Sequence, residues 1–91
     1  MISGAQIRGA RSLLGWSATD LSARADVSWA TIQRFESQDQ IPNSKAGTLE
    51  RLKVTLEAQG IVFLGDPEQS PGVQLIRKPL AKKGRAGSSA R

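Results

Sequence analysis

The chain has 91 residues, a formal net charge of +5, and neither cysteine nor histidine. A chain of this length normally forms one domain with a single modest core, unless a second subunit adds to that core. The missing residue types exclude disulfides, thiolate metal sites and imidazole catalysis. We therefore expect no enzyme, no cofactor and no metal site.

The positive charge is concentrated near the C-terminus. Residues 1–60 carry seven basic and six acidic side chains, whereas residues 80–91 carry four basic side chains and no acidic one. A basic total often indicates a nucleic-acid partner, but here the first 60 residues are almost neutral. No segment reaches the roughly 20 apolar residues that cross a bilayer, and the start of the chain lacks the apolar core of a secretion signal. We expect a cytoplasmic protein.

Two helices are predicted in the first 25 residues. The first runs from about Ser3 to Leu14, and Gly15 ends it. Its predicted inward stripe consists of Ile7, Ala10, Leu13 and Leu14. Ser17 is a favourable N-cap with Asp20 in the following turn. This pattern predicts a short second helix over residues 18–25.

Two further helices are predicted after a turn at Asp26 and Val27. The third runs from the N-cap Ser28 to about Ser37, with Ile32 and Phe35 facing inward. Residues 38–44 contain proline, asparagine and serine and are predicted to form a loop. The fourth helix runs from about Lys45 to Gln59, and Gly60 stops it. Its inward residues are Leu49, Leu52 and Leu56.

Two short β-type runs, Ile61–Leu64 and Val73–Ile76, follow the helices and predict a hairpin across the loop GDPEQSPG. The first run is apolar on both faces, so one face can cover the helices and the other needs a partner. We expect the second run to pair with the same strand of another subunit. The predicted dimer interface consists of Ile61, Val62, Phe63, Leu64, Val73, Leu75 and Ile76.

The last segment, residues 79–91, is small, polar and basic without periodicity, and this composition predicts disorder. The expected organisation is therefore a helical domain over residues 1–60, a hairpin over residues 61–78 and a disordered basic tail over residues 79–91. The tail either adds nonspecific phosphate contacts or keeps the protein soluble.

The spacing of residues between Ala18 and Phe35 is typical of a helix-turn-helix, in which two short helices touch at a small residue. Counted from Ala18, the fourth, fifth, eighth, tenth, fifteenth and eighteenth positions are occupied by Leu21, Ser22, Ala25, Val27, Ile32 and Phe35. The segment GWSATDLSARADVSWATIQRFESQDQIP resembles the helix-turn-helix core of the phage repressor and Cro family, also called the xenobiotic response element family. The resemblance extends over about residues 3–59.

The resemblance implies a mainly α, lambda-repressor-like domain of four helices, followed here by the hairpin and the tail. It also implies that the third helix enters the major groove of double-stranded DNA. Base reading carries over to Trp29, Ala30, Thr31, Gln33 and Arg34. Phosphate contacts carry over to Ser17, Thr19, Ser28, Asn43, Ser44 and Lys45. The resemblance also pairs Glu36 with Arg11 as a structural ion pair.

Each of these assignments has a simpler alternative. Gln33 and Arg34 match the chemistry of adenine and guanine edges, but the same residues are common on solvated helix faces. Ser17 and Ser28 serve equally as helix caps. Trp29 can pack against Val27 or the hairpin instead of facing DNA.

Two positions depart from the family pattern. Asp26 stands where a turn glycine is usual, and aspartate is one of the few side chains that tolerates a positive φ angle. The polar loop SQDQ, residues 37–40, replaces the usual glycine and basic residue, which weakens the expected grip on phosphate.

The favoured function is a bacterial, sequence-specific transcription regulator such as a repressor, which acts on the nucleoid as a symmetric homodimer with recognition helices about 34 Å apart. An alternative from another class is the antitoxin half of a toxin–antitoxin pair, whose hairpin or tail neutralises a partner protein while the helical domain autoregulates. A third alternative is a scaffold that has lost DNA binding, which the near-neutral helical part favours.

Overall fold

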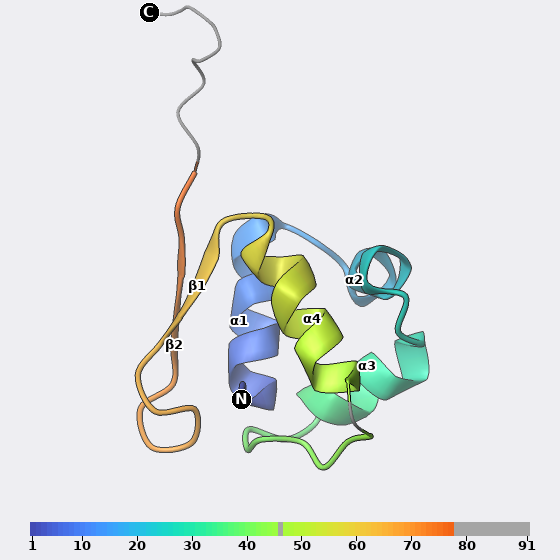
Figure 1. Ribbon diagram of the computed structural model, residues 1–91, viewed down its shortest axis with the longest axis horizontal. Coiled ribbons are helices and arrows are strands. Elements are labelled where there is room, and N and C mark those ends of the chain that lie inside the picture. The colour runs from blue at the N-terminus through green and yellow to red at the C-terminus, as the bar shows by residue number, and fades with distance from the viewer. Residues whose placement is uncertain (46, 78–91) are drawn as a thin grey trace, which may run out of the picture.

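The computed structural model describes residues 1–45 and 47–77, so the predicted disordered tail, residues 79–91, lies outside the described residues. The elements in chain order are α1 (Gly4–Leu14), α2 (Ala18–Ala25), α3 (Trp29–Glu36), α4 (Thr48–Glu57), β1 (Ile61–Leu64) and β2 (Gly72–Leu75). Figure 1 shows the four helices packed together, with the hairpin of β1 and β2 alongside α1. The described part of the chain is thus mainly α with one antiparallel hairpin, as the sequence predicts.

Serine caps begin the first three helices. The hydroxyl oxygens of Ser3, Ser17 and Ser28 each accept a hydrogen bond from the backbone N–H three residues later. In α1 and α2 the side chains of Gln6 and Asp20 return the bond and accept from the backbone N–H of the cap residue. These reciprocal bonds form capping boxes, which satisfy two otherwise unpaired donors at each helix start.

Three details differ from the sequence prediction. The helix α4 begins at Thr48 rather than Lys45, because Gly47 has a φ of 89°, which a right-handed helix does not accommodate. The strand β2 covers residues 72–75 rather than 73–76. Leu13 is 42 % exposed and does not belong to the inward stripe. It lies about 120° around the helix from the buried Ile7.

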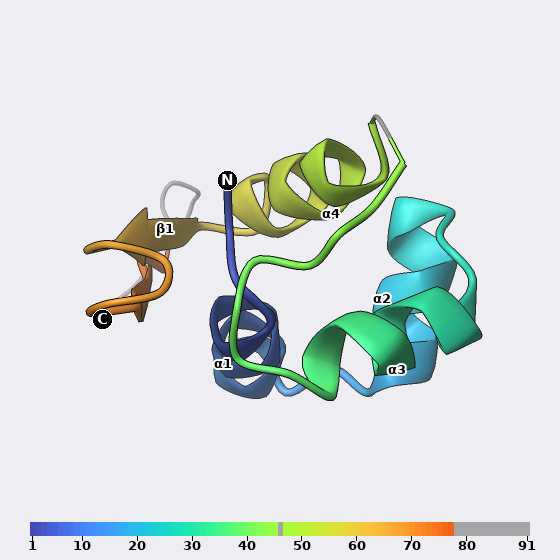
Figure 2. The same cartoon turned by 90° about the horizontal axis from the view of Figure 1, so that it is seen from below.

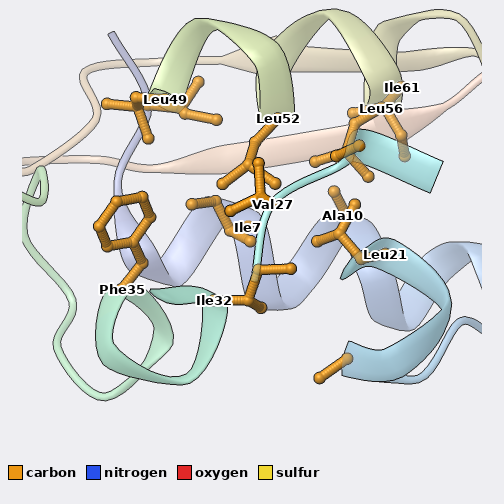
Figure 3. Close-up of a cluster of buried hydrophobic side chains, with 13 residues drawn as sticks. Ile7, Ala10, Leu21, Val27, Ile32, Phe35, Leu49, Leu52, Leu56 and Ile61 are labelled. Carbon is orange, nitrogen blue, oxygen red and sulfur yellow. The ribbon is translucent and has the colours of Figure 1, made fainter. Parts of the chain in front are cut away.

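One continuous core joins all six elements. Figure 3 shows Leu49, Leu52 and Leu56 of α4 facing side chains of α1 and α3. The largest fully buried apolar side chains are Phe35, Ile2, Ile7, Leu21, Ile32, Leu52 and Leu56. Ile61 of β1 is 2 % exposed and belongs to the same cluster. The hairpin therefore shares the core of the helices.

The hairpin presents only one of its faces to the helices. Ile61 lies opposite Leu75, and Phe63 lies opposite Val73. All four side chains are packed in or against the core, so they face the helices rather than a second subunit, whereas the predicted dimer interface itself stays a prediction. The reason is the alternation of side chains along a strand, which leaves Val62, Leu64 and Ile76 on the outer side of the hairpin.

Gln6 fastens the hairpin to α1. Its side-chain nitrogen donates to the backbone carbonyl oxygens of Leu64 and Gly72 at 3.2 and 3.0 Å. The residue is 2 % exposed, so these bonds satisfy an amide that would be costly to bury unpaired.

In the part of the chain that the structure describes, no helix is long and apolar enough to cross a lipid bilayer.

Replacing Phe35 by alanine should lower the free energy of unfolding by about 3–5 kcal/mol, because a fully buried ring would leave a cavity between α3 and α4. The matched Leu13→Ala variant removes an exposed side chain of α1 and should change that free energy by less than about 0.5 kcal/mol. Urea unfolding followed by far-ultraviolet circular dichroism measures both. Equal losses would contradict the placement of Leu13 outside the core.

Candidate nucleic-acid interface

The turn between α2 and α3 is fixed by one left-handed residue and by two hydrogen bonds. Asp26 has a φ of 56°, the left-handed conformation that its place in the sequence predicts. The hydroxyl of Ser22 donates to the carbonyl oxygen of Val27 at 2.7 Å, and Val27 is itself buried. Arg51 of α4 donates to the carbonyl oxygen of Asp26 at 2.9 Å. The angle between the two helices is therefore held by contacts from α2 and α4.

Four exposed residues share the outer face of α3. Trp29, Ala30, Gln33 and Arg34 are all exposed, and their spacing places them on one side of the helix. The opposite side is buried against the core through Ile32 and Phe35. Figure 2 shows α3 at the edge of the molecule beside α2. This exposed surface, which we call the α3 face, contains four of the five predicted base-reading residues.

Thr31 is the predicted base-reading residue that lies off the α3 face. It is half-buried, and its hydroxyl oxygen accepts a hydrogen bond from the hydroxyl of Ser28 at 2.8 Å. Its backbone N–H donates to the same serine at 3.1 Å. Thr31 therefore completes the cap of α3.

Trp29 is free of the core. The residue is 54 % exposed and is not among the hydrophobic residues packed in or against the core. Tryptophan is highly buried on average. An exposed tryptophan at the start of a helix therefore offers apolar area and an indole N–H donor to a partner.

Arg34 lies at the border between the α3 face and the following loop. Its guanidinium donates a hydrogen bond to the carbonyl oxygen of Asn43 at 3.3 Å, and its guanidinium carbon lies 5.0 Å from the centroid of the Phe35 ring. Asn43 and Lys45 are exposed, and Ser44 is half-buried. Arg34 thus joins the predicted base-reading residues to the predicted phosphate-binding loop.

The start of α2 carries a negative charge. Ser17 and Thr19 are exposed there, but the carboxylate of Asp20 accepts the backbone N–H of Ser17 at 2.9 Å. This hydrogen bond lowers the pKa of Asp20 below its usual value, so the carboxylate is ionised at neutral pH. A phosphate at this end of α2 would be repelled by that carboxylate. The start of α4 has no side-chain cap and so carries no such charge on a cap.

Arg11 and Glu36 form a bidentate ion pair. Their nitrogen–oxygen distances are 2.8 and 3.0 Å, and the Glu36 side chain is 6 % exposed. A third guanidinium nitrogen of Arg11 donates to the carbonyl oxygen of Trp16 at 2.9 Å. The hydrogen bonds that Arg11 donates to Glu36 raise the pKa of Arg11, so its guanidinium stays charged. The pair attaches the end of α3 to α1.

Arg8 is a second arginine that supports the end of α3, and its role was not predicted from the sequence. It donates to the carbonyl oxygens of Glu36 and Gln38 and forms an ion pair with Asp39. The available signal was its spacing of three residues from Arg11, which places both arginines on one side of α1. Asp39, in the polar loop over residues 37–40, is therefore held by an arginine of the protein itself.

Gly4 allows α1 to approach the end of α3 closely. A Cβ atom at this position would collide with the backbone carbonyl oxygens of Phe35 and Gln38. The backbone N–H of Gly4 donates to the carbonyl oxygen of Gln40 at 2.9 Å. Only glycine fits this contact between the start of one helix and the end of the other.

No protein-family model, curated protein or solved structure matches this chain. Within residues 1–45 and 47–77, no cluster of three histidine, cysteine, aspartate or glutamate side chains is arranged to hold a metal ion. The α3 face and the loop beside it are the surface from which we infer a function.

Replacing Arg11 by methionine should lower the free energy of unfolding by about 3 kcal/mol, because the buried Glu36 carboxylate loses its partner. Adding Glu36→Leu should recover part of that loss, so the double variant loses less than the two single variants together. Urea unfolding of the four proteins measures the coupling. Lys53→Met is the control, because it removes an exposed pair with Glu57 at 3.7 Å, worth about 0.3–0.5 kcal/mol. Strict additivity would contradict a coupled pair.

Proposed function

We propose that the protein is a sequence-specific DNA-binding regulator of transcription, in which α2 and α3 form a helix-turn-helix and α3 enters the major groove. The α3 face carries this proposal, because its exposed residues project from a helix whose other side is buried. The major groove is wide enough for an α-helix. The sequence resemblance to the phage repressor and Cro family supports the same docking.

Gln33 is central to the proposed reading. Its amide can donate to and accept from the adenine edge, whereas the arginine fork of Arg34 matches the guanine edge. Trp29 and Ala30 offer apolar contact to thymine methyl groups. Together these residues give the α3 face one amide, one cation and two apolar contacts for discriminating base pairs.

The proposed phosphate grip comes mainly from the loop after α3. Asn43 and Lys45 are exposed there, next to the guanidinium of Arg34. The start of α2 is less suited, because Asp20 is ionised beside Ser17. Since residues 1–60 are nearly neutral, we expect the affinity for DNA to depend less on salt than it does for strongly basic proteins.

A single α3 helix reads only a short site. Its eight residues span roughly 12 Å along the helix axis, which is about the rise of three or four base pairs of duplex DNA. Two copies on a two-fold-symmetric operator would double the number of base pairs that are read. The proposed active species is therefore a homodimer on a palindromic site.

The test is selection of randomised DNA duplexes by the full-length protein, followed by sequencing. The wild type should enrich a palindromic motif, and the variant Gln33→Ala with Arg34→Ala should lose that enrichment. The control variant Lys53→Ala with Gln59→Ala removes one cation and one amide from the α4 region instead, and should enrich the wild-type motif. Absence of enrichment by the wild type would contradict the proposal and favour the protein-interaction alternatives.

The single variant Arg34→Ala separates base reading from phosphate binding. If Arg34 reads guanine, as we expect, specificity should relax at one operator position at a cost of about 1–3 kcal/mol. Binding of each operator variant at several salt concentrations measures this. A uniform loss over all sequences, with a salt slope reduced by about one, would assign Arg34 to a phosphate instead.

A further inference from the structure

The outer edge of β2 presents unpaired backbone groups. The backbone N–H of Ile76 donates to the carbonyl oxygen of Gly60 at 2.8 Å. Together with the register of the hairpin, this bond makes residues 62 and 74 a hydrogen-bonded pair, so the N–H and C=O groups of Val73 and Leu75 point away from β1. Among the described residues, no backbone hydrogen bond from a helix or loop reaches these four groups.

This edge lacks the devices by which proteins prevent strands from pairing. Residues 72–76 include no charged residue and no proline, although exposed edges are usually protected by such residues or by bulges. The outer face beside the edge is apolar, with Leu64 43 % and Ile76 54 % exposed. Gly72 lies opposite Leu64 in the hairpin and leaves the surface beside that leucine open.

We infer that β2 pairs antiparallel with β2 of a second copy of this chain, with Gln74 opposite Gln74 at the two-fold axis, to form a four-stranded sheet. In this register Val73 of each copy exchanges both backbone hydrogen bonds with Leu75 of the other copy. Centring the pairing on Val73 would place Leu75 opposite Pro71, which has no N–H to donate. Centring it on Leu75 would require Arg77, which lies outside β2.

The outer faces of the two copies are complementary in the proposed register. Ile76 of one copy lies opposite Gly72 of the other copy, where no side chain occupies the surface. Because Leu64 is the strand partner of Gly72, the isoleucine of one copy then adjoins the leucine of the other. The two most exposed apolar side chains of the hairpin cover each other twice, once at each end of the interface.

The charges at the two ends of β2 also favour antiparallel self-pairing. The loop before β2 carries Asp66 and Glu68 and no basic residue, whereas Arg77 follows the strand. In the proposed register Arg77 of one copy lies opposite Pro71 of the other, at the end of the acidic loop. Parallel pairing would instead bring Arg77 of one copy next to Arg77 of the other copy.

Cross-linking through Gln74→Cys tests this interface, because the protein has no cysteine of its own. In the proposed register the two residues at position 74 form a non-hydrogen-bonded pair, whose Cα atoms lie about 4.5 Å apart, within the range of a disulfide. Oxidation of the full chain without DNA should give a covalent dimer on a non-reducing gel. Leu64→Cys is the control on the same face: its two copies would lie about 14 Å apart across three strand spacings and about 13 Å apart along the strands, roughly 20 Å in all, so this variant should stay monomeric. A monomeric Gln74→Cys protein, or equal cross-linking of both variants, would overturn the inference.

A second variant tests the interface without oxidation. Gln74→Lys puts two like charges opposite each other at the two-fold axis, while the exposed position leaves the fold intact by circular dichroism. Sedimentation should show a monomer for Gln74→Lys and a dimer for Gln69→Lys, which adds the same charge in the hairpin loop. A dimeric Gln74→Lys protein would refute the pairing. Neither experiment involves DNA, so failure of this interface is distinguishable from failure of the proposed function.

Discussion

The ion pair between Arg11 and Glu36 is the constraint on which the arrangement of α3 depends. Glu36 follows directly after Phe35, whose ring is buried in the core, so the position of the carboxylate is fixed by packing as well as by charge. In the proposed complex with DNA, an exposed acidic side chain at the end of α3 would repel phosphate. The guanidinium turns this carboxylate inward, and the exposed side of α3 is left with amide, aromatic and cationic groups. The same interaction thus stabilises the fold and sets the chemistry of the surface.

The first helix is the frame of the whole molecule, because its polar side chains hold both of the elements that carry proposed interfaces. Arg8 and Arg11 hold the end of α3, and Gln6 holds the two strands. The buried and half-buried polar groups of this helix are all hydrogen-bonded, which avoids the desolvation cost of unpaired groups. The apolar residues of α1 pack in the core, whereas its polar side chains determine which elements lie next to α1.

Local sequence signals predicted the helices and the hairpin well, since serine caps, glycine stops and apolar spacing act within a few residues. The positive φ of Asp26 and the pairing of Arg11 with Glu36 were expected from the family pattern and are present in the structure. The contacts of Gln6, Arg8 and Gly4 were not predicted, because each joins segments far apart in the sequence. The inward stripe was overextended to Leu13 for a different reason: an exposed leucine is chemically identical to a buried one, and only packing distinguishes them. The same limit explains why the predicted dimer interface includes four hairpin side chains that pack in or against the core.

The amide of Gln6 has a mechanical consequence. It joins both strands to α1, and α1 is joined to the end of α3 by two arginines, so no flexible linker separates the hairpin from the α3 face. The path between them consists of α1 and mainly part-buried hydrogen bonds, so a rotation of the hairpin must be transmitted to α3. An assembly built through the hairpin would hold its two α3 helices at a nearly constant separation. Under the proposed function, such a dimer would discriminate targets by the length of the spacer as well as by the sequence on either side of it.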